Sequence, residues 1–270
     1  MPQPIRHPNR IATVRALAAG CAIVALGLCG CQTASAPDIT GSLGEGTESS
    51  RVADTPRKLD AYRDRFRANP RDADAALAYG RALRTSGQRS QAVAVLEQAS
   101  IANSGNKLLL AGYGRALADN GNFQQAFDVL GRAHSPDNPD WRILSVQGAA
   151  LDQLGRHEEA RQYYSSALKI APDEPSVLSN LGLSYVLSKE LPQAEEVLRR
   201  ASARAGADSR VRQNLALVIG LQGRLSEAET IVKADLPAEQ AAANVTQLRQ
   251  LLSRKQDARA DMDKGRKRSD

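Results

Sequence analysis

The sequence predicts an all-α solenoid of five helical repeats with a capping helix at each end. Three observations support this class. Self-similarity recurs every 34 residues from Ala73 to Ala242, and no insertion or deletion interrupts it. Alanine and leucine supply most of the apolar content, while aromatic residues make up only 4% of the chain, which favours closely packed helices over a β-sandwich. One such unit cannot bury its own apolar face, so stacking of neighbours creates the core.

The period is clearest at small residues. Position 8 of the repeat holds Gly80, Gly114, Gly148, Gly182 and Ala216, and position 20 holds Ala92, Ala126, Ala160, Ala194 and Ala228. Small side chains at both positions allow two helices to cross closely. Position 15 holds Gly87, Gly121, Gly155, Lys189 and Gly223, and glycine there permits a left-handed turn between the two helices.

This pattern resembles the tetratricopeptide repeat, which implies a superhelical solenoid of antiparallel helix pairs. The sequence before the first repeat resembles the second half of a repeat, and an apolar stripe after the fifth repeat can close the other end. The predicted segments are a lipoprotein signal peptide (1–30), a flexible tether (31–56), an N-terminal capping helix (57–72), five tetratricopeptide repeats (73–242), a C-terminal capping helix (243–256, starting near 237) and a disordered charged tail (257–270).

The first thirty residues predict export and lipidation. Arginines precede an apolar run from Ala16 to Leu28, which is too short for a permanent membrane span and suits a signal peptide. The run ends in LCGC, which resembles the bacterial lipobox with Cys31 as the lipid acceptor, and Gln32 resembles the outer-membrane sorting pattern. An ordinary secretory peptide with incidental cysteines is the alternative. We therefore expect an outer-membrane lipoprotein that faces the periplasm, with the tether holding the repeats off the membrane.

Few residues are available for chemistry. The chain has three histidines, and its three cysteines all fall within the first 31 residues, which excludes a zinc finger, an iron–sulfur protein and a disulfide scaffold. The net charge is +6, and half of it lies in the first thirty residues. No basic stripe with interleaved aromatics is present, so we expect no nucleic acid partner. We also expect no metal, no cofactor and no small-molecule substrate.

An enzyme is not expected. His157 is predicted to have a half-buried structural role, and His134 to lie in a loop. The acidic pairs Glu158–Glu159 and Glu195–Glu196 are predicted to be solvated, because adjacent helical residues point about 100° apart. A cell-wall hydrolase, the other class considered, needs a separate catalytic domain, and only 28 residues follow the fifth repeat.

The concave surface is the predicted partner-binding site. Positions 2, 5, 9, 12 and 13 of each first helix lie opposite the core face. They include the basic residues Arg81, Arg84, Arg115 and Arg142, the acidic residues Asp74, Asp119 and Asp152, and the apolar residues Leu183, Val186, Leu187, Leu217 and Leu221. Grouped apolar side chains of this kind mark contact sites. We expect a partner segment that is apolar at one end and acidic at the other; alternatively, the C-terminal helix covers these leucines.

A family resemblance narrows the expected function. The closing segment DLPAEQAAANVTQLRQLL (235–252), with the lipobox and the repeats, resembles the TadD family of the tight-adherence (Tad, or Flp) pilus. The resemblance implies a pilotin that helps a secretin reach or assemble in the outer membrane, with a secretin or another pilus-assembly component as partner. Only Cys31 carries over as a functional position. A lipoprotein adaptor for β-barrel assembly or for cell-wall hydrolases is the alternative.

Overall fold

The computed structural model describes residues 56–235, Thr246 and Gln250. Residues 56–235 form helices and connecting turns with no β-strand, as the predicted class requires. The helices are α1 (Pro56–Ala68), α2 (Ala73–Thr85), α3 (Arg89–Ala102), α4 (Lys107–Asp119), α5 (Phe123–Ala133), α6 (Trp141–Gln153), α7 (His157–Ile170), α8 (Pro175–Leu187), α9 (Leu191–Ser202), α10 (Ser209–Leu221) and α11 (Leu225–Lys233). The predicted signal peptide, the predicted charged tail, the tether before Pro56 and most of the predicted C-terminal capping helix lie outside the described residues.

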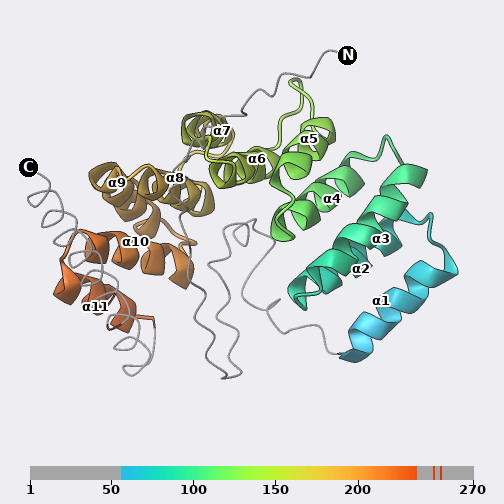
Figure 1. The fold of residues 1–270 in the computed structure, drawn as a ribbon, viewed down its shortest axis with the longest axis horizontal. Coiled ribbons are helices and arrows are strands. Elements are labelled where there is room, and N and C mark those ends of the chain that lie inside the picture. The colour runs from blue at the N-terminus through green and yellow to red at the C-terminus, as the bar shows by residue number, and fades with distance from the viewer. Residues whose placement is uncertain (1–55, 236–245, 247–249, 251–270) are drawn as a thin grey trace, which may run out of the picture. The chain divides into compact units, whose positions relative to one another are not determined.

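The helices pack in five antiparallel pairs in chain order (Figure 1). Each helix contacts the next along the chain, and each pair's first helix also contacts the first helix of the following pair. The helix α1 packs on α2, in the place of the second helix of a preceding repeat. It ends at Ala68, earlier than the expected 72, because a turn at residues 69–72 precedes α2.

Glycine sets how closely the two helices of a repeat approach. A Cβ atom on Gly80 would lie 2.6 Å from Cγ of Leu96, and one on Gly182 would lie 2.5 Å from Cγ of Leu198. Any side chain at position 8 would therefore overlap the residue at position 24. In the fifth repeat position 8 is Ala216, and position 24 is the smaller Val232. A larger residue at position 8 thus goes with a smaller one at position 24, because the two side chains pack into the same space between the helices.

A periodic cap starts each first helix. Position 34 of the repeat supplies a side-chain oxygen that accepts a hydrogen bond from a backbone N–H of the following helix, at Asp72, Asn106, Asp140, Glu174 and Asp208. Such caps satisfy N–H groups that have no partner within the helix. Between the helices of each pair, the turn residue at position 15 has positive φ in all five repeats, at Gly87, Gly121, Gly155, Lys189 and Gly223. The predicted turn position is confirmed, including the exception at Lys189, where φ is 66°.

Candidate partner-binding surface

We call residues at positions 2, 5, 9, 12 and 13 of helices α2, α4, α6, α8 and α10 the first-helix surface. Arg81 is exposed, whereas Arg84, Arg115 and Arg142 are half-buried. The guanidinium of Arg142 stacks on its neighbour, with Cζ 4.5 Å from the ring centroid of Trp141. Three of the four predicted basic residues are thus partly covered, and Arg81 is the exposed one.

Polar contacts link successive first helices, some of them beneath this surface. Arg84 Nε donates to Asp119 Oδ2 at 2.5 Å, and both side chains are less than a quarter exposed. Farther along, Asn180 Nδ2 donates to Ser145 Oγ at 3.1 Å, and Asn214 Nδ2 donates to Ser179 Oγ at 2.9 Å. The predicted basic residue Arg84 therefore holds α2 to α4, and this ion pair offsets its charge.

The apolar part of the surface is only partly exposed. Leu187 is 47% exposed and Leu217 is 38% exposed. Leu183, Val186 and Leu221 are half-buried, and Val186 packs against the core formed by α9, α10 and α11. The predicted apolar residues therefore contribute two solvent-facing leucines, one on α8 and one on α10.

Two further apolar residues are more exposed than any predicted one. Ile101, near the end of α3, is 78% exposed, and Leu108, at the start of α4, is 74% exposed. Leu108 stands at position 2 of its repeat, so the rule that defined the first-helix surface also selects it. Ile101 lies on the second helix of its repeat. The helical period alone does not tell whether such a residue is exposed or packs against a neighbouring helix.

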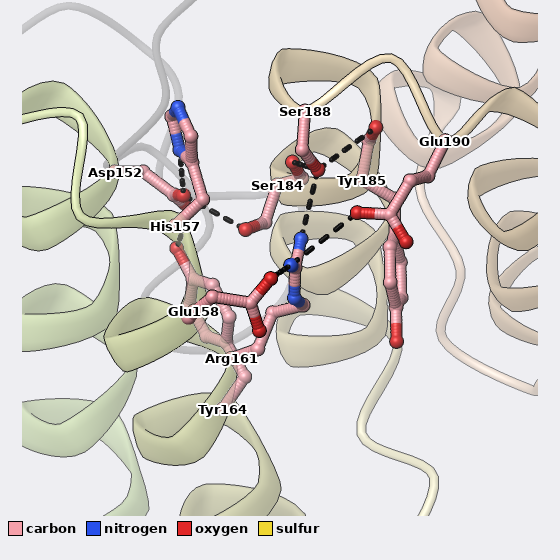
Figure 2. A network of polar contacts seen from close by, with 9 residues as sticks. All are labelled: Asp152, His157, Glu158, Arg161, Tyr164, Ser184, Tyr185, Ser188 and Glu190. Carbon is pink, nitrogen blue, oxygen red and sulfur yellow. Dashed lines mark hydrogen bonds and ion pairs between the residues drawn. The ribbon is translucent and has the colours of Figure 1, made fainter.

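Asp152 differs from the expectation that it lines the concave surface. Its side chain is buried, at 3% exposure, and its carboxylate accepts three hydrogen bonds (Figure 2). The donors are Tyr164 Oη at 2.9 Å, Ser184 Oγ at 2.8 Å and His157 Nδ1 at 2.9 Å. Burial, with the Asp152 carboxylate beside it, raises the pKa of Tyr164 well above its usual value. The carboxylate joins α6 to α7 and to α8 of the next repeat, so it holds the fold together.

Arg161 lies beside this cluster and extends the link between the third and fourth repeats (Figure 2). Its Nη1 donates to Ser188 Oγ at 2.8 Å, and its guanidinium lies 4.8 Å from the ring centroid of Tyr185. It also pairs with Glu158, and with Glu190 at 3.3 Å. His157 is half-buried, as predicted, and its contact with Asp152 gives it a structural role.

Three of the four glutamates in the two acidic pairs form ion pairs. Glu159 pairs with Arg156 at 2.6 Å, while Glu158 pairs with Arg161. Glu195 accepts from Arg224 and from Arg199, and these guanidinium groups, Arg224 first, lower the pKa of Glu195 to about 2. Glu158 and Glu159 thus pair with different arginines, as the helical geometry predicts. Glu195 differs from the predicted solvated position, because its side chain is half-buried and pairs with Arg199 and Arg224.

Within residues 56–235 no group of three histidine, cysteine or acidic side chains is placed to hold a metal ion. None of the helices described there is both long enough and apolar enough to cross a membrane.

Family models match most of the repeat region. Two models, each described as a tetratricopeptide repeat, match residues 151–218 in one case and residues 80–139 and 114–175 in the other. Together they span residues 80–218, just over half of the chain, from within α2 to within α10. The chain belongs to the tetratricopeptide-repeat family. A search of curated proteins found no match to this tetratricopeptide-repeat chain.

Solved structures share the fold at low sequence identity. The APC/C hetero-tetramer Cut9–Hcn1 matches with a TM-score of 0.61 and 18% identity over 76% of this chain; the match spans 41% of that chain. PilW, described as a widely conserved type IV pilus biogenesis factor, matches with a TM-score of 0.61 and 15% identity over 74% of this chain and 100% of its own. PilF of Pseudomonas aeruginosa matches with a TM-score of 0.50 and 18% identity over 65% of this chain and 80% of its own.

Proposed function

We propose that this tetratricopeptide-repeat protein is an outer-membrane-anchored periplasmic scaffold of the pilotin type. In this proposal it binds a segment of a protein partner, a secretin or another assembly component, while a Tad pilus is built. The observation that carries the proposal is a repeat array whose first-helix surface presents exposed leucines in the fourth and fifth repeats and an exposed arginine, Arg81, in the first. The fold likeness to PilW, which covers all of that pilus biogenesis factor, supports the assignment to pilus assembly.

The lipobox-like sequence supports the anchoring part of the proposal. Acyl chains on Cys31 would contribute roughly 0.8 kcal/mol per buried methylene, and several chains together make a stable anchor. The tether between Cys31 and Pro56 then sets the reach of the repeats. If it behaves as the flexible chain that its composition predicts, the segment from residue 31 to residue 56 would span about 28 Å.

The mechanism is binding without chemistry. The first-helix surface offers Leu187 and Leu217 to apolar side chains of the partner, and Arg81 to an acidic one. The fold needs no rearrangement to present these residues, because the Arg84–Asp119 pair and the hydrogen bonds between successive first helices hold the helices in place. Such preorganisation reduces the entropic cost of capturing a flexible segment.

Co-purification tests the proposal. The lipidated protein would be purified from membranes and its partners identified by mass spectrometry, with Cys31→Ala as the matched control. We expect the native protein to recover a secretin, and the control to lose it or to leave it mislocalised. Recovery of barrel-assembly proteins or cell-wall hydrolases in place of pilus components would overturn the assignment to the pilus and retain the scaffold.

A further inference from the structure

A polar cavity of about 460 Å³ lies between α1 and α3, over α2. It is separate from the first-helix surface. Its walls combine the polar side chains Arg63, Arg67, Tyr79, Gln88 and Gln91 with the apolar side chains Leu59, Ala94 and Val95. Each of these polar side chains can donate a hydrogen bond, and the lining includes no carboxylate.

In the next repeat, the equivalent site between α3, α4 and α5 is occupied by side chains that hydrogen-bond to one another. The residues 34 positions later than Arg63, Tyr79 and Gln91 are Glu97, Tyr113 and Gln125. Tyr113 Oη donates to Glu97 Oε1 at 3.1 Å, and Gln125 Nε2 donates to Tyr113 Oη at 3.1 Å. Burial and the Glu97 carboxylate raise the pKa of Tyr113 to about 12. A carboxylate between α3 and α5 thus anchors a chain of hydrogen bonds.

At the cavity the carboxylate is missing and its donors remain. Arg63 stands where Glu97 stands one repeat later, so the chain Glu–Tyr–Gln cannot form. Among residues 56–235, none hydrogen-bonds to Tyr79 Oη, to the side-chain amide of Gln91 or to the guanidinium of Arg67. Arg63 Nε is buried with no hydrogen-bond partner, 3.6 Å from the Asp64 carboxylate.

The charge around the cavity also favours an anion. Arg63 forms ion pairs with Asp60 through Nη2 at 2.8 Å and with Asp64 through Nε at 3.6 Å. The second contact is too long for a hydrogen bond, so the buried Nε still lacks an acceptor, and the guanidinium of Arg67 has none among residues 56–235. A buried donor without an acceptor costs free energy, and a charged acceptor recovers the most because charge-assisted hydrogen bonds are the strong ones.

We infer that this cavity binds a carboxylate side chain, an aspartate or glutamate, from an extended segment of a protein partner. The carboxylate takes the place that Glu97 holds one repeat later and accepts from Arg63, Arg67 and Tyr79. Leu59, Ala94 and Val95 accommodate the methylenes of the acidic residue and an adjacent apolar side chain. The inference rests only on the part of the proposed function that gives this protein a protein partner. It does not depend on whether that partner is a secretin.

Two labelled peptides test the site on the full chain in detergent. One is acetyl-Gly-Leu-Glu-Leu-Gly-Ser, and the other has glutamine in place of the glutamate. Fluorescence anisotropy is expected to show that the glutamate peptide binds at least about tenfold more tightly. Arg63→Glu supplies a carboxylate from the protein itself and removes this preference. Arg67→Ala, at an exposed position, weakens the glutamate peptide several-fold.

Arg132→Glu is the matched control, because it makes the same charge change at an exposed position on α5 outside the cavity. It is expected to leave the preference unchanged. Equal binding of both peptides, binding of neither up to millimolar concentration, or a glutamate preference that survives Arg63→Glu would overturn the inference. If Arg63→Glu loses its helical circular dichroism, the test rests on Arg67→Ala. Unchanged binding of the glutamate peptide by Arg67→Ala would then overturn the inference. Failure of the proposed function appears separately, as recovery of other partners in the co-purification.

Discussion

Arg212 and Asp235 form a bidentate ion pair in the last repeat, with Arg212 Nη2 2.5 Å from Asp235 Oδ1 and Nε 2.6 Å from Oδ2. These residues stand at positions 4 and 27. In the first four repeats both positions are apolar and buried: Ala76 with Ala99, Leu110 with Ala133, Leu144 with Ala167, and Leu178 with Ala201. Both members of the pair have therefore changed together in the fifth repeat, because either charge alone would face an apolar neighbour.

We expect Asp235→Ala to lower the free energy of unfolding by about 1–3 kcal/mol, since it leaves a half-buried guanidinium without its carboxylate. The double variant Arg212→Leu with Asp235→Ala should recover most of this loss, because it restores the apolar pair of the earlier repeats. Urea unfolding of both single variants and the double variant measures the coupling. Purely additive losses would contradict a coupled pair.

Gly114→Ala should destabilise the protein by about 1–3 kcal/mol, although alanine favours helix over glycine by about 1 kcal/mol. The reason is that the added Cβ would lie 2.5 Å from Cγ of Leu130. Adding Leu130→Val should restore stability, because the fifth repeat combines Ala216 with Val232 at these positions. Thermal unfolding checks both variants, and a neutral Gly114→Ala would show that the helices separate without cost.

Tyr164→Phe should lower the free energy of unfolding by about 1–3 kcal/mol, because the buried Asp152 carboxylate loses one of its three donors. Tyr163→Phe is the matched control: the hydroxyl of the neighbouring Tyr163 forms no hydrogen bond with the residues that the structure describes, so its loss should change stability little. Chemical unfolding monitored by circular dichroism compares the two. Equal effects would mean that the contact with Asp152 contributes nothing specific.

Replacing Leu187 and Leu217 with aspartate should abolish capture of the partner while leaving helicity intact, because both side chains already face solvent in the free protein. The co-purification described above supplies the readout. Ile101→Asp is the control, since Ile101 is still more exposed and lies on a second helix. Capture that survives the double change would move the binding site away from the first-helix surface.

The repeat architecture could be predicted from the sequence, because each repeating residue satisfies a geometric requirement that occurs once in every helix pair. Glycine at position 8 reflects the close approach of the two helices, and glycine at position 15 reflects a positive φ. The same period predicts that Leu187 and Leu217 share a surface, and both side chains are exposed in the structure. The caps at position 34 also follow the period, and an oxygen-bearing side chain every 34 residues is a signal that the sequence contains.

Contacts between different positions of neighbouring repeats were decided only by the tertiary structure. Periodicity placed Asp152 on the binding surface, yet the structure buries it, because Tyr164 and Ser184 supply donors that the other repeats lack at those positions. Beside the cavity, Arg63 likewise has the opposite charge from its counterpart Glu97, so the hydrogen bonds that link Glu97, Tyr113 and Gln125 have no equivalent there. The repeat pattern identifies the residues that all five units share. The burial of a side chain, its hydrogen-bond partners and the cavities depend on residues that differ between units and on the helices that pack against them.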